Sequence, residues 1–249
     1  MTHVFGDLTI VDATAGSSSY GHTFGGPVDR SDALPDQTNG IRLHMLHRFD
    51  MNDPLMPIQL PGLRWLPLYY VFDFRANEVG YQLTSDSKMI TFFSDNEPNI
   101  SDAESWPADD FPLEFSPHPI RLALHDFDPT DLDDVARWAG IFGIRYLDDD
   151  RLAELKRRID TDCDEIGDYR PEGDDYFDYL SSPLWQGTPN NPCINPECSN
   201  HQIPRSLKML AVVPYKPIEG LEIWGGACVD TLFEICPLCR TIRASNQCG

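Results

Sequence analysis

The spacing of four cysteines near the C-terminus constrains this chain more than any other feature of its sequence. Cys193 and Cys198 form a first pair, and Cys236 and Cys239 form a second pair after 37 intervening residues. Two thiolates in one tight turn reach a metal ion from adjacent corners, and structural zinc takes four such ligands in a tetrahedron. The second pair follows a strand-like run, as in a zinc-ribbon hairpin. The sequence therefore predicts a zinc site of Cys193, Cys198, Cys236 and Cys239.

Two alternatives compete with this ligand set. Cys198-Ser-Asn-His201 also has a two-residue spacing and would give a Cys3His site in which His201 replaces Cys193. The four thiols could also be buried free cysteines, since free cysteine is among the most buried residue types. Four protein ligands close the coordination sphere, whereas catalytic zinc keeps an open position. We therefore expect a structural role for the metal.

The net charge of −21 is the second unusual property of the chain. It arises from 40 Asp and Glu residues against 19 Lys and Arg residues. A field of this sign repels nucleic-acid phosphates and anionic membranes and attracts basic partners. Two interpretations stay open: a solvated surface that favours solubility, or a basic protein partner such as a ribosomal protein or a cationic toxin. Hydrophobic residues make up 41% of the chain, so a globular core is expected.

The N-terminal residues contain no targeting signal that we can identify. Residues 1–20 hold Asp7 and Asp12, no Lys or Arg, and no continuous apolar run. No window of the sequence approaches the roughly 18 apolar residues of a membrane-spanning helix. We expect a cytoplasmic protein, and a reducing cytosol favours metal binding over disulfides for closely spaced cysteines.

Strand-like patterns dominate both ends of the chain, and helical patterns occur only in its middle. The connection 94–119 holds five prolines and a cluster of acids, which predicts irregular structure. Pro67 indicates an edge position or a bulge for its strand. Strands are expected at 4–13, 41–49, 63–74, 80–84, 88–94, 207–215, 221–226 and 229–236, and helices at 132–142 and 150–160.

An internal repeat is suggested by sliding the chain on itself. An offset of 164 residues places Leu43 and Leu46 on Leu207 and Leu210, and Leu68 on Leu232. We therefore predict an α+β fold, mostly antiparallel sheet in two repeated sheet units with a few helices and a C-terminal zinc-ribbon-like site. The expected regions are an N-terminal sheet unit with its Pro-rich connection (1–119), an acidic helical middle (120–180) and a C-terminal sheet unit with the zinc site (181–249). Together they could form one compact, pseudo-duplicated domain.

Other candidate sites carry weaker signals. His44 and His47 share an extended segment, where residues three apart point to opposite faces, so core or surface roles are expected. His125-Asp126-Phe127-Asp128 resembles an acid–base cluster, but such adjacency is common in so acidic a chain. The aromatic residues between Trp65 and Phe74 either line a groove or form the two faces of a buried strand. Cys163, Cys228 and Cys248 have no convincing partners.

Several segments resemble a known family. The pieces are Gly187-Thr-Pro189, the four cysteines, Leu207-Lys-Met-Leu210 and Leu232-Phe-Glu-Ile-Cys236, with counterparts at Gly25-Gly-Pro27, Leu43-His-Met-Leu46 and Leu68-Tyr-Tyr-Val71. They resemble the YwqG-like family of uncharacterised bacterial proteins, and the cysteine region also resembles the programmed cell death protein two family. The resemblance implies two repeated sheet units, a structural zinc and no established catalytic residues. The second family resembles chaperones for a ribosomal protein.

Two functions follow as hypotheses from these patterns. The first is a non-catalytic, zinc-stabilised, acidic cytoplasmic protein that binds a basic protein partner and neither nucleic acid nor membrane. The closed metal site and the charge favour it. The second is a hydrolase with carboxylates and a histidine such as His125 in a cleft between the two sheet units. No recognisable catalytic motif supports the second hypothesis.

Overall fold

A computed structural model describes the fold of the chain. It describes residues 2–6, 9–28, 43–72, 79–86, 88–93, 111–126, 128, 148–150, 153–154, 157, 192–204, 206–218, 220–224 and 229–248. The chain divides into two compact units, the first comprising residues 1–124 with 191–249 and the second residues 125–190. The first unit contains all the strands and the four cysteines, and it brings the two ends of the chain into one body.

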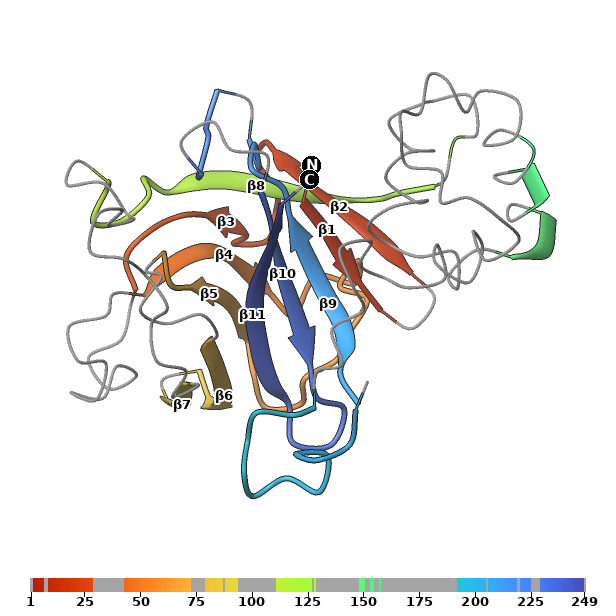
Figure 1. Ribbon diagram of the computed structural model, residues 1–249. Coiled ribbons are helices and arrows are strands. Elements are labelled where there is room, and N and C mark those ends of the chain that lie inside the picture. Colours follow the sequence, from red (N-terminus) through yellow and green to blue (C-terminus); the bar gives the residue numbers. More distant parts are fainter. Residues whose placement is uncertain are drawn as a thin grey trace. The chain divides into compact units, whose positions relative to one another are not determined.

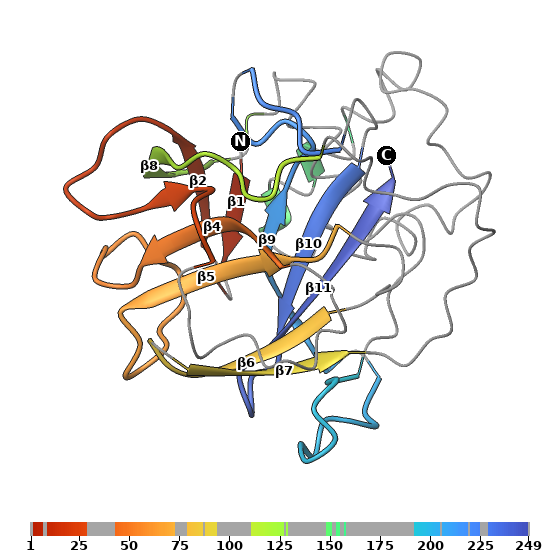
Figure 2. The ribbon, with the colours of Figure 1, turned by 90° about the vertical axis from the view of Figure 1, so that its left-hand side faces the viewer.

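The first unit is built on one curled, antiparallel sheet of eleven strands (Figures 1 and 2). The order across the sheet is β5-β4-β3-β8-β2-β1-β9-β10-β11-β6-β7. The prediction of a mostly antiparallel sheet is confirmed, but the expected α+β fold with two separate sheet units is not, because the strands form a single sheet. The strands are β1 (Thr2–Phe5), β2 (Ile10–Ala15), β3 (Thr23–Phe24), β4 (His44–Asp50), β5 (Trp65–Tyr70), β6 (Val79–Ser85), β7 (Lys88–Phe93), β8 (His118–Leu124), β9 (Lys208–Val213), β10 (Val229–Ile235) and β11 (Thr241–Cys248).

Two groups of three strands within this sheet share one register. The pairing of β4 with β5 matches the pairing of β9 with β10. Adding 164 to a β4 residue and 165 to its β5 partner gives a paired residue of β9 and its β10 partner, as for Met45↔Tyr69 and Met209↔Glu234. Each pair has a bulge at the same place, which leaves Leu46 and Leu210 as the extra residues. The neighbouring strands β3 and β1 also pair at corresponding positions of β4 and β9. The sequence offset of 164 therefore holds for β4 and β9, whereas β5 and β10 correspond at an offset of 165, so that Leu68 matches Phe233 and not Leu232.

Side chains, and not backbone pairing, join the two ends of the curled sheet. β5 is the first strand of the sheet, as the proline in its centre indicated. The Tyr81 hydroxyl on β6 donates to the carbonyl oxygen of Pro67 over 2.9 Å and accepts from the amide of Tyr69 over 3.1 Å. Tyr81 thus satisfies two backbone groups of β5 that have no strand partner, and the inside of the sheet stays closed at this seam.

The concave side of the sheet holds a large aromatic core. Phe72 lies at its centre, with ring centroids 4.9 Å from Tyr70 and Trp224 and 5.0 Å from Phe111. His44 joins the same cluster and its Nε2 donates to the carbonyl oxygen of Pro112 over 2.9 Å. These rings explain why the run between Trp65 and Phe72 is almost wholly buried, as the buried-strand interpretation expected.

Several predicted elements are corrected by the structure. The stretch 4–13 is two strands and not one, because the chain turns after Phe5 and the Gly6 amide donates to the carbonyl of Thr9 over 2.9 Å. Of the predicted strand 221–226, the described residues 221–224 form an isolated bridge at Leu221 and no longer strand. The strand β8 begins at the end of the expected irregular connection and lies mostly at the start of the expected helical middle, where no strand was predicted. The alternation of Ile120 and Leu122 with polar residues decides its conformation.

Helix is nearly absent from the described residues. Residues 149, 150, 153, 154 and 157 are helical, within or next to the predicted helix 150–160. The predicted helix 132–142 lies outside the described residues. Among the described residues, no helix is long and apolar enough to cross a membrane.

Candidate metal centre

The four predicted cysteines meet at one end of the sheet. Cys193 and Cys198 come from the loop that precedes β9, while Cys236 and Cys239 lie in the turn between β10 and β11. Figure 1 shows these two segments side by side at the lower end of the first unit. We call residues 192–204 and 236–240 the cysteine lobe. Cys193 and Cys236 are buried, and Cys198 and Cys239 are half-buried.

The distances between the sulfurs fit a tetrahedral metal site. The Sγ atoms of Cys193 and Cys239 are 3.4 Å apart, those of Cys198 and Cys236 are 3.7 Å apart, and all four lie within 4.8 Å of one another. Zn–S bonds of about 2.3 Å place tetrahedral sulfurs about 3.8 Å apart. The four thiols therefore form a cluster that could hold one metal ion.

Backbone amides in both turns point at the sulfurs. The amides of Asn195, Asn200 and Thr241 donate to the sulfurs of Cys193, Cys198 and Cys239. Each donor lies two residues after its acceptor, which requires a tight turn at every pair. Such donors stabilise negative charge on sulfur, so the turns favour thiolates over thiols.

The turn between β10 and β11 has the backbone strain that a metal-binding turn requires. Cys236 accepts from the Arg240 amide over 2.9 Å and donates to the carbonyl of Thr241 over 2.8 Å. Arg240 has φ of 62°, in the left-handed region that non-glycine residues rarely adopt. The Arg240 guanidinium donates to the carbonyl of Pro61 over 3.3 Å. Arg240 thus ends the turn, and its side chain also contacts the neighbouring loop at Pro61.

The thiols differ in acidity in the metal-free protein. Burial raises the pKa of Cys193, and it also raises the pKa of Cys198. Burial acts in the same direction on Cys239, but hydrogen bonds from the Thr241 hydroxyl and amide and from the neighbouring thiols outweigh it and lower the pKa to about 7. The Thr241 hydroxyl is 3.0 Å from the Cys239 sulfur. A pKa of about 7 means that the Cys239 thiol is partly ionised at neutral pH.

His201 lies in the lobe but outside the group of four converging thiols. Its Nδ1 donates to the carbonyl oxygen of Cys193 over 2.7 Å, and its own amide donates to the carbonyl of Cys198 over 2.9 Å. The ring thus fixes the backbone that carries the first cysteine pair. The geometry favours the four-cysteine set over the Cys3His alternative, with His201 as a supporting residue.

The cysteine lobe packs directly against β6. Gln82 Nε2 donates to the carbonyl oxygen of Cys239 over 2.6 Å. Gly80 faces Ile194 so closely that a Cβ at this position would lie 2.3 Å from the Ile194 Cγ2 atom. A metal in the lobe would therefore fix the loop before β9 and the β10–β11 turn against the last strands of the sheet.

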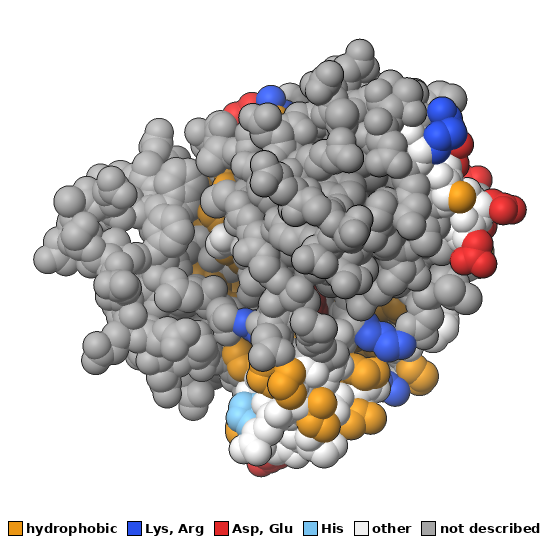
Figure 3. All heavy atoms as spheres, turned by 45° about the vertical axis from the view of Figure 1, so that its right-hand side comes forward, with side chains coloured by type: hydrophobic (Ala, Val, Ile, Leu, Met, Phe, Trp, Pro, Cys, Tyr) orange, Lys and Arg blue, Asp and Glu red, His pale blue; other side chains and the backbone are white. Residues whose placement is uncertain are grey.

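The outer surface of the lobe mixes apolar residues with the exposed polar residues Glu197, Ser199, Gln202 and Arg240. Ile203 is 50% exposed and Leu238 is 62% exposed, and three prolines of the lobe are exposed as well: Pro196, Pro204 and Pro237. Figure 3 shows hydrophobic side chains gathered at this lower end of the surface, next to Lys and Arg side chains. Ile90, Leu113 and Leu124 are large exposed apolar residues outside the lobe.

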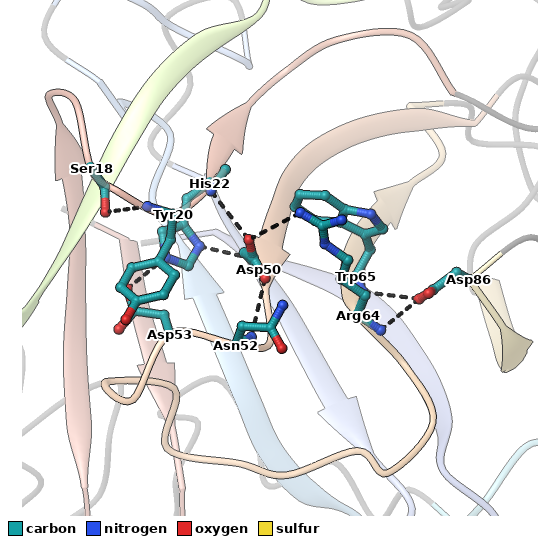
Figure 4. A network of polar contacts seen from close by, with 10 residues as sticks. Ser18, Tyr20, His22, Asp50, Asn52, Asp53, Arg64, Trp65 and Asp86 are labelled. Carbon is teal, nitrogen blue, oxygen red and sulfur yellow. Dashed lines mark hydrogen bonds and ion pairs between the residues drawn. The ribbon is translucent and has the colours of Figure 1, made fainter.

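A second polar cluster, around His22, was not identified from the sequence (Figure 4). His22 is buried, and its Nδ1 accepts from the amide of Asp50 over 3.0 Å. Its Nε2 therefore carries the proton and donates to Asp53 over 2.8 Å. Both ring nitrogens make hydrogen bonds, so His22 could act as a base only if its hydrogen bond from the Asp50 amide were broken. The cluster fastens the loop before β3 to the turn after β4.

The first unit contains a buried histidine–carboxylate pair of the kind that the hydrolase hypothesis requires, with His3 Nδ1 3.1 Å from Asp12 Oδ1. His125 and Asp126 follow directly on β8 and belong to the second unit. The single continuous sheet leaves no pair of sheet units to form the expected cleft. Cys163, Cys228 and the side chain of Cys248 lie outside the described residues.

Sequence reasoning missed the residues that support the cysteines. Asn200 donates to the Cys236 sulfur over 3.5 Å, and Gln82 and Thr241 contact Cys239. Only Thr241, two residues after a cysteine, had a signal in the local sequence. Gln82 lies 157 residues from its partner, which no short motif reveals. Comparison of the chain with protein-family models, with curated proteins and with solved structures finds no match.

Proposed function

We propose that this protein is a non-catalytic binding protein, stabilised by one structural zinc ion and acting in the cytoplasm on a basic protein partner. The cysteine lobe supports the zinc assignment. Thiolate ligands select zinc or iron among common metals, and four converging sulfurs in two amide-lined turns match structural zinc. Four sulfur ligands leave no position for a substrate, so the site's chemistry supports stabilisation and not catalysis.

The distribution of charge is the observation that carries the proposed partner. Residues 94–110 hold six acidic residues and no Lys or Arg, and residues 125–190 hold 18 acidic residues against seven basic ones. The remainder of the chain is close to neutral. Charge concentrated in two segments creates a local field that a uniformly acidic surface would not, and such a field attracts a basic partner and speeds its association.

The exposed apolar residues of the cysteine lobe support the same proposal from a second direction. Protein interfaces combine a desolvated apolar centre with a polar rim. Leu238 and Ile203 supply exposed apolar side chains on a lobe whose backbone the metal would hold rigid. The resemblance to the programmed cell death protein two family makes a basic ribosomal protein the partner that we favour.

We also infer that the sheet contains a duplicated unit, since the shared register and bulge of β4–β5 and β9–β10 are more than a match of apolar residues. One copy carries the cysteine pairs at its ends, and the other has none. The metal would then belong to the copy that the partner contacts.

A pull-down from lysate at two salt concentrations tests the proposed partner. We expect basic proteins at low salt that are released as salt screens charges beyond a Debye length of about 10 Å at 0.1 M. Recovery of no basic protein at low salt, or of proteins whose retention ignores salt, would overturn the proposal.

Charge-neutralised variants make the test specific. One variant replaces the six acidic residues of 94–110 by their amides, and a second does so at six positions of the second unit: Asp131, Asp133, Asp134, Asp174, Asp175 and Asp178. A control neutralises the exposed Glu114 and Glu222, which lie on the sheet-bearing unit outside the cysteine lobe. The proposal predicts weaker, less salt-dependent capture for at least one of the first two variants and unchanged capture for the control.

A further inference from the structure

A small pocket lies at the seam where β5 meets the β6–β7 hairpin. Its volume is about 70 Å³, and it opens to solvent. The walls come from β4 and β5 on one side and from the hairpin on the other. The lining residues that the argument uses are Met45, Arg48, Trp65, Asp86, Lys88 and Met89.

Arg48 is a half-buried cation for which no described residue supplies a counter-ion. Its guanidinium carbon lies 4.6 Å from the centre of the Trp65 ring, and Arg64 lies 4.7 Å from the same ring. The Arg48 side chain makes no hydrogen bond or ion pair with the described residues, and its Nε is buried without a partner. A guanidinium that has lost part of its hydration and found no acceptor is unusual, because burial of an unpaired charge is costly.

The Asp86 carboxylate in the pocket wall is already engaged in hydrogen bonds to the backbone. Asp86 Oδ1 accepts from the backbone amides of Arg64 over 2.7 Å and of Trp65 over 3.0 Å (Figure 4). These bonds hold the hairpin tip against the start of β5 and fix the shape of the pocket. Lys88 is exposed at the rim and adds a second positive charge.

We propose that this pocket binds a small organic monocarboxylate. The carboxylate would accept from Arg48, near Lys88, and a short apolar stem would lie on Met45 and Met89 beside the Trp65 ring. Arg binds a carboxylate through two parallel N–H donors, so the ligand carboxylate would supply an acceptor for the Arg48 guanidinium. Asp86 disfavours a ligand with two negative charges, and the two cations exclude a positively charged one.

The size of the pocket limits the ligand. An engineered cavity of about 150 Å³ accommodates benzene, so a volume of about 70 Å³ suits a stem of three or four carbons. A ligand of this size reaches a Kd in the millimolar range at best, which corresponds to about −4 kcal/mol. This site is independent of the proposed partner. The pocket would bind its ligand through the cations Arg48 and Lys88, whereas the partner would be attracted by acidic residues elsewhere in the chain.

Titration with butyrate, followed by ¹H–¹⁵N NMR, tests the proposal. Butyrate is expected to shift the indole N–H resonance of Trp65, assigned by loss of the signal in Trp65→Phe, with saturation in the millimolar range. Butan-1-ol and n-butylammonium match its stem and are expected to bind at least tenfold more weakly. Equal shifts from all three compounds, or none from butyrate, would overturn the proposal.

Variants test the assigned cation. Arg48→Met keeps the apolar stem of the side chain and is expected to weaken butyrate binding at least tenfold, and Lys88→Gln about threefold. Arg121→Met, an exposed arginine on β8, serves as the matched control with unchanged affinity. Metal content and the unfolding midpoint show whether each variant is folded, and butyrate affinity unchanged in a folded Arg48→Met would refute the assignment. If Arg48→Met does not fold, the comparison of the three compounds on the unmodified protein decides.

Discussion

The hydroxyl of Tyr81 donates a hydrogen bond to the carbonyl oxygen of Pro67 over 2.9 Å, and this contact joins the two ends of the eleven-stranded sheet. The same oxygen accepts from the Tyr69 amide, so one side chain takes the place of a neighbouring strand. Burial raises the pKa of this phenol far above its ordinary value, which keeps the donor protonated at any physiological pH. The closure of the sheet is therefore insensitive to pH.

Tyr81→Phe should destabilise the protein by about 1–3 kcal/mol, because the hydrogen bonds to the Pro67 carbonyl and from the Tyr69 amide would both be lost in a buried site. Urea unfolding followed by tryptophan fluorescence measures this loss. Tyr20→Phe is the control, since the Tyr20 hydroxyl makes no hydrogen bond with the described residues. Equal stability of the two variants would show that the seam does not depend on this hydroxyl.

The purified protein should contain one zinc ion per chain, as measured by elemental analysis. Cys236→Ser should lose the metal, and so should Cys193→Ser. His201→Gln should retain it, because a glutamine amide can still donate to the carbonyl of Cys193. Zinc retained by Cys193→Ser and lost by His201→Gln would instead establish the Cys3His site.

Removal of the metal should lower stability by an amount that grows with the logarithm of its affinity. Free zinc at 1,000 times its Kd contributes about 4 kcal/mol, and a chelator should abolish this contribution. The loss should appear as a lower unfolding midpoint in urea, and added zinc should restore it. Cadmium, which also binds thiolates, should restore it too, whereas magnesium should not. An unfolding midpoint that ignores the chelator would contradict a structural metal.

Gly80→Ala should cost about 1–3 kcal/mol, because its Cβ would overlap the branched side chain of Ile194. The loss comes from a clash between β6 and the cysteine lobe, so it should be relieved in the double variant Gly80→Ala, Ile194→Ala. A double-mutant cycle in urea measures this coupling. Additive losses would mean that the lobe does not press on β6 at this point.

His47 should make the protein sensitive to mild acid. Burial lowers its pKa from about 6.5 to about 3, and neither ring nitrogen has a hydrogen-bond partner. The unfolded chain takes up this proton as pH falls through 6.5, while the folded protein does not until pH is near 3. Folding stability is therefore lost over this interval, by about 2 kcal/mol between pH 7.5 and 5.

His47→Phe should remove this loss while keeping a ring against Phe24 and Phe49. At pH 7.5 the variant should be at least as stable as the unmodified protein, and its advantage should grow as pH falls to 5. Unfolding curves at four pH values measure the difference in unfolding free energy between the variant and the unmodified protein. The effects of the other histidines and of the metal are shared by both proteins and cancel in this difference. A constant difference across the pH range would mean that His47 does not titrate as its burial predicts.

The sequence alone determined the local elements. The short spacing within each cysteine pair is typical of a turn that presents two sulfurs to one metal ion. This feature is local and does not depend on the rest of the chain. Alternation of apolar residues located β4, β5, β6, β7, β9 and β10, because each strand buries at least one face. The proline in β5 indicated an edge strand, since proline removes a backbone donor.

Only the tertiary structure decided how these strands join. The sequence offset of 164 predicted two sheet units, but β2 and β8 pair with each other and merge the two groups into one curled sheet. Gln82 reaches the Cys239 carbonyl, and Arg48 reaches the seam pocket, through contacts between residues far apart in the chain. Local patterns report what each residue prefers to bury, whereas the choice of partner depends on loop closure and on the packing of the whole sheet, which no short segment of sequence contains.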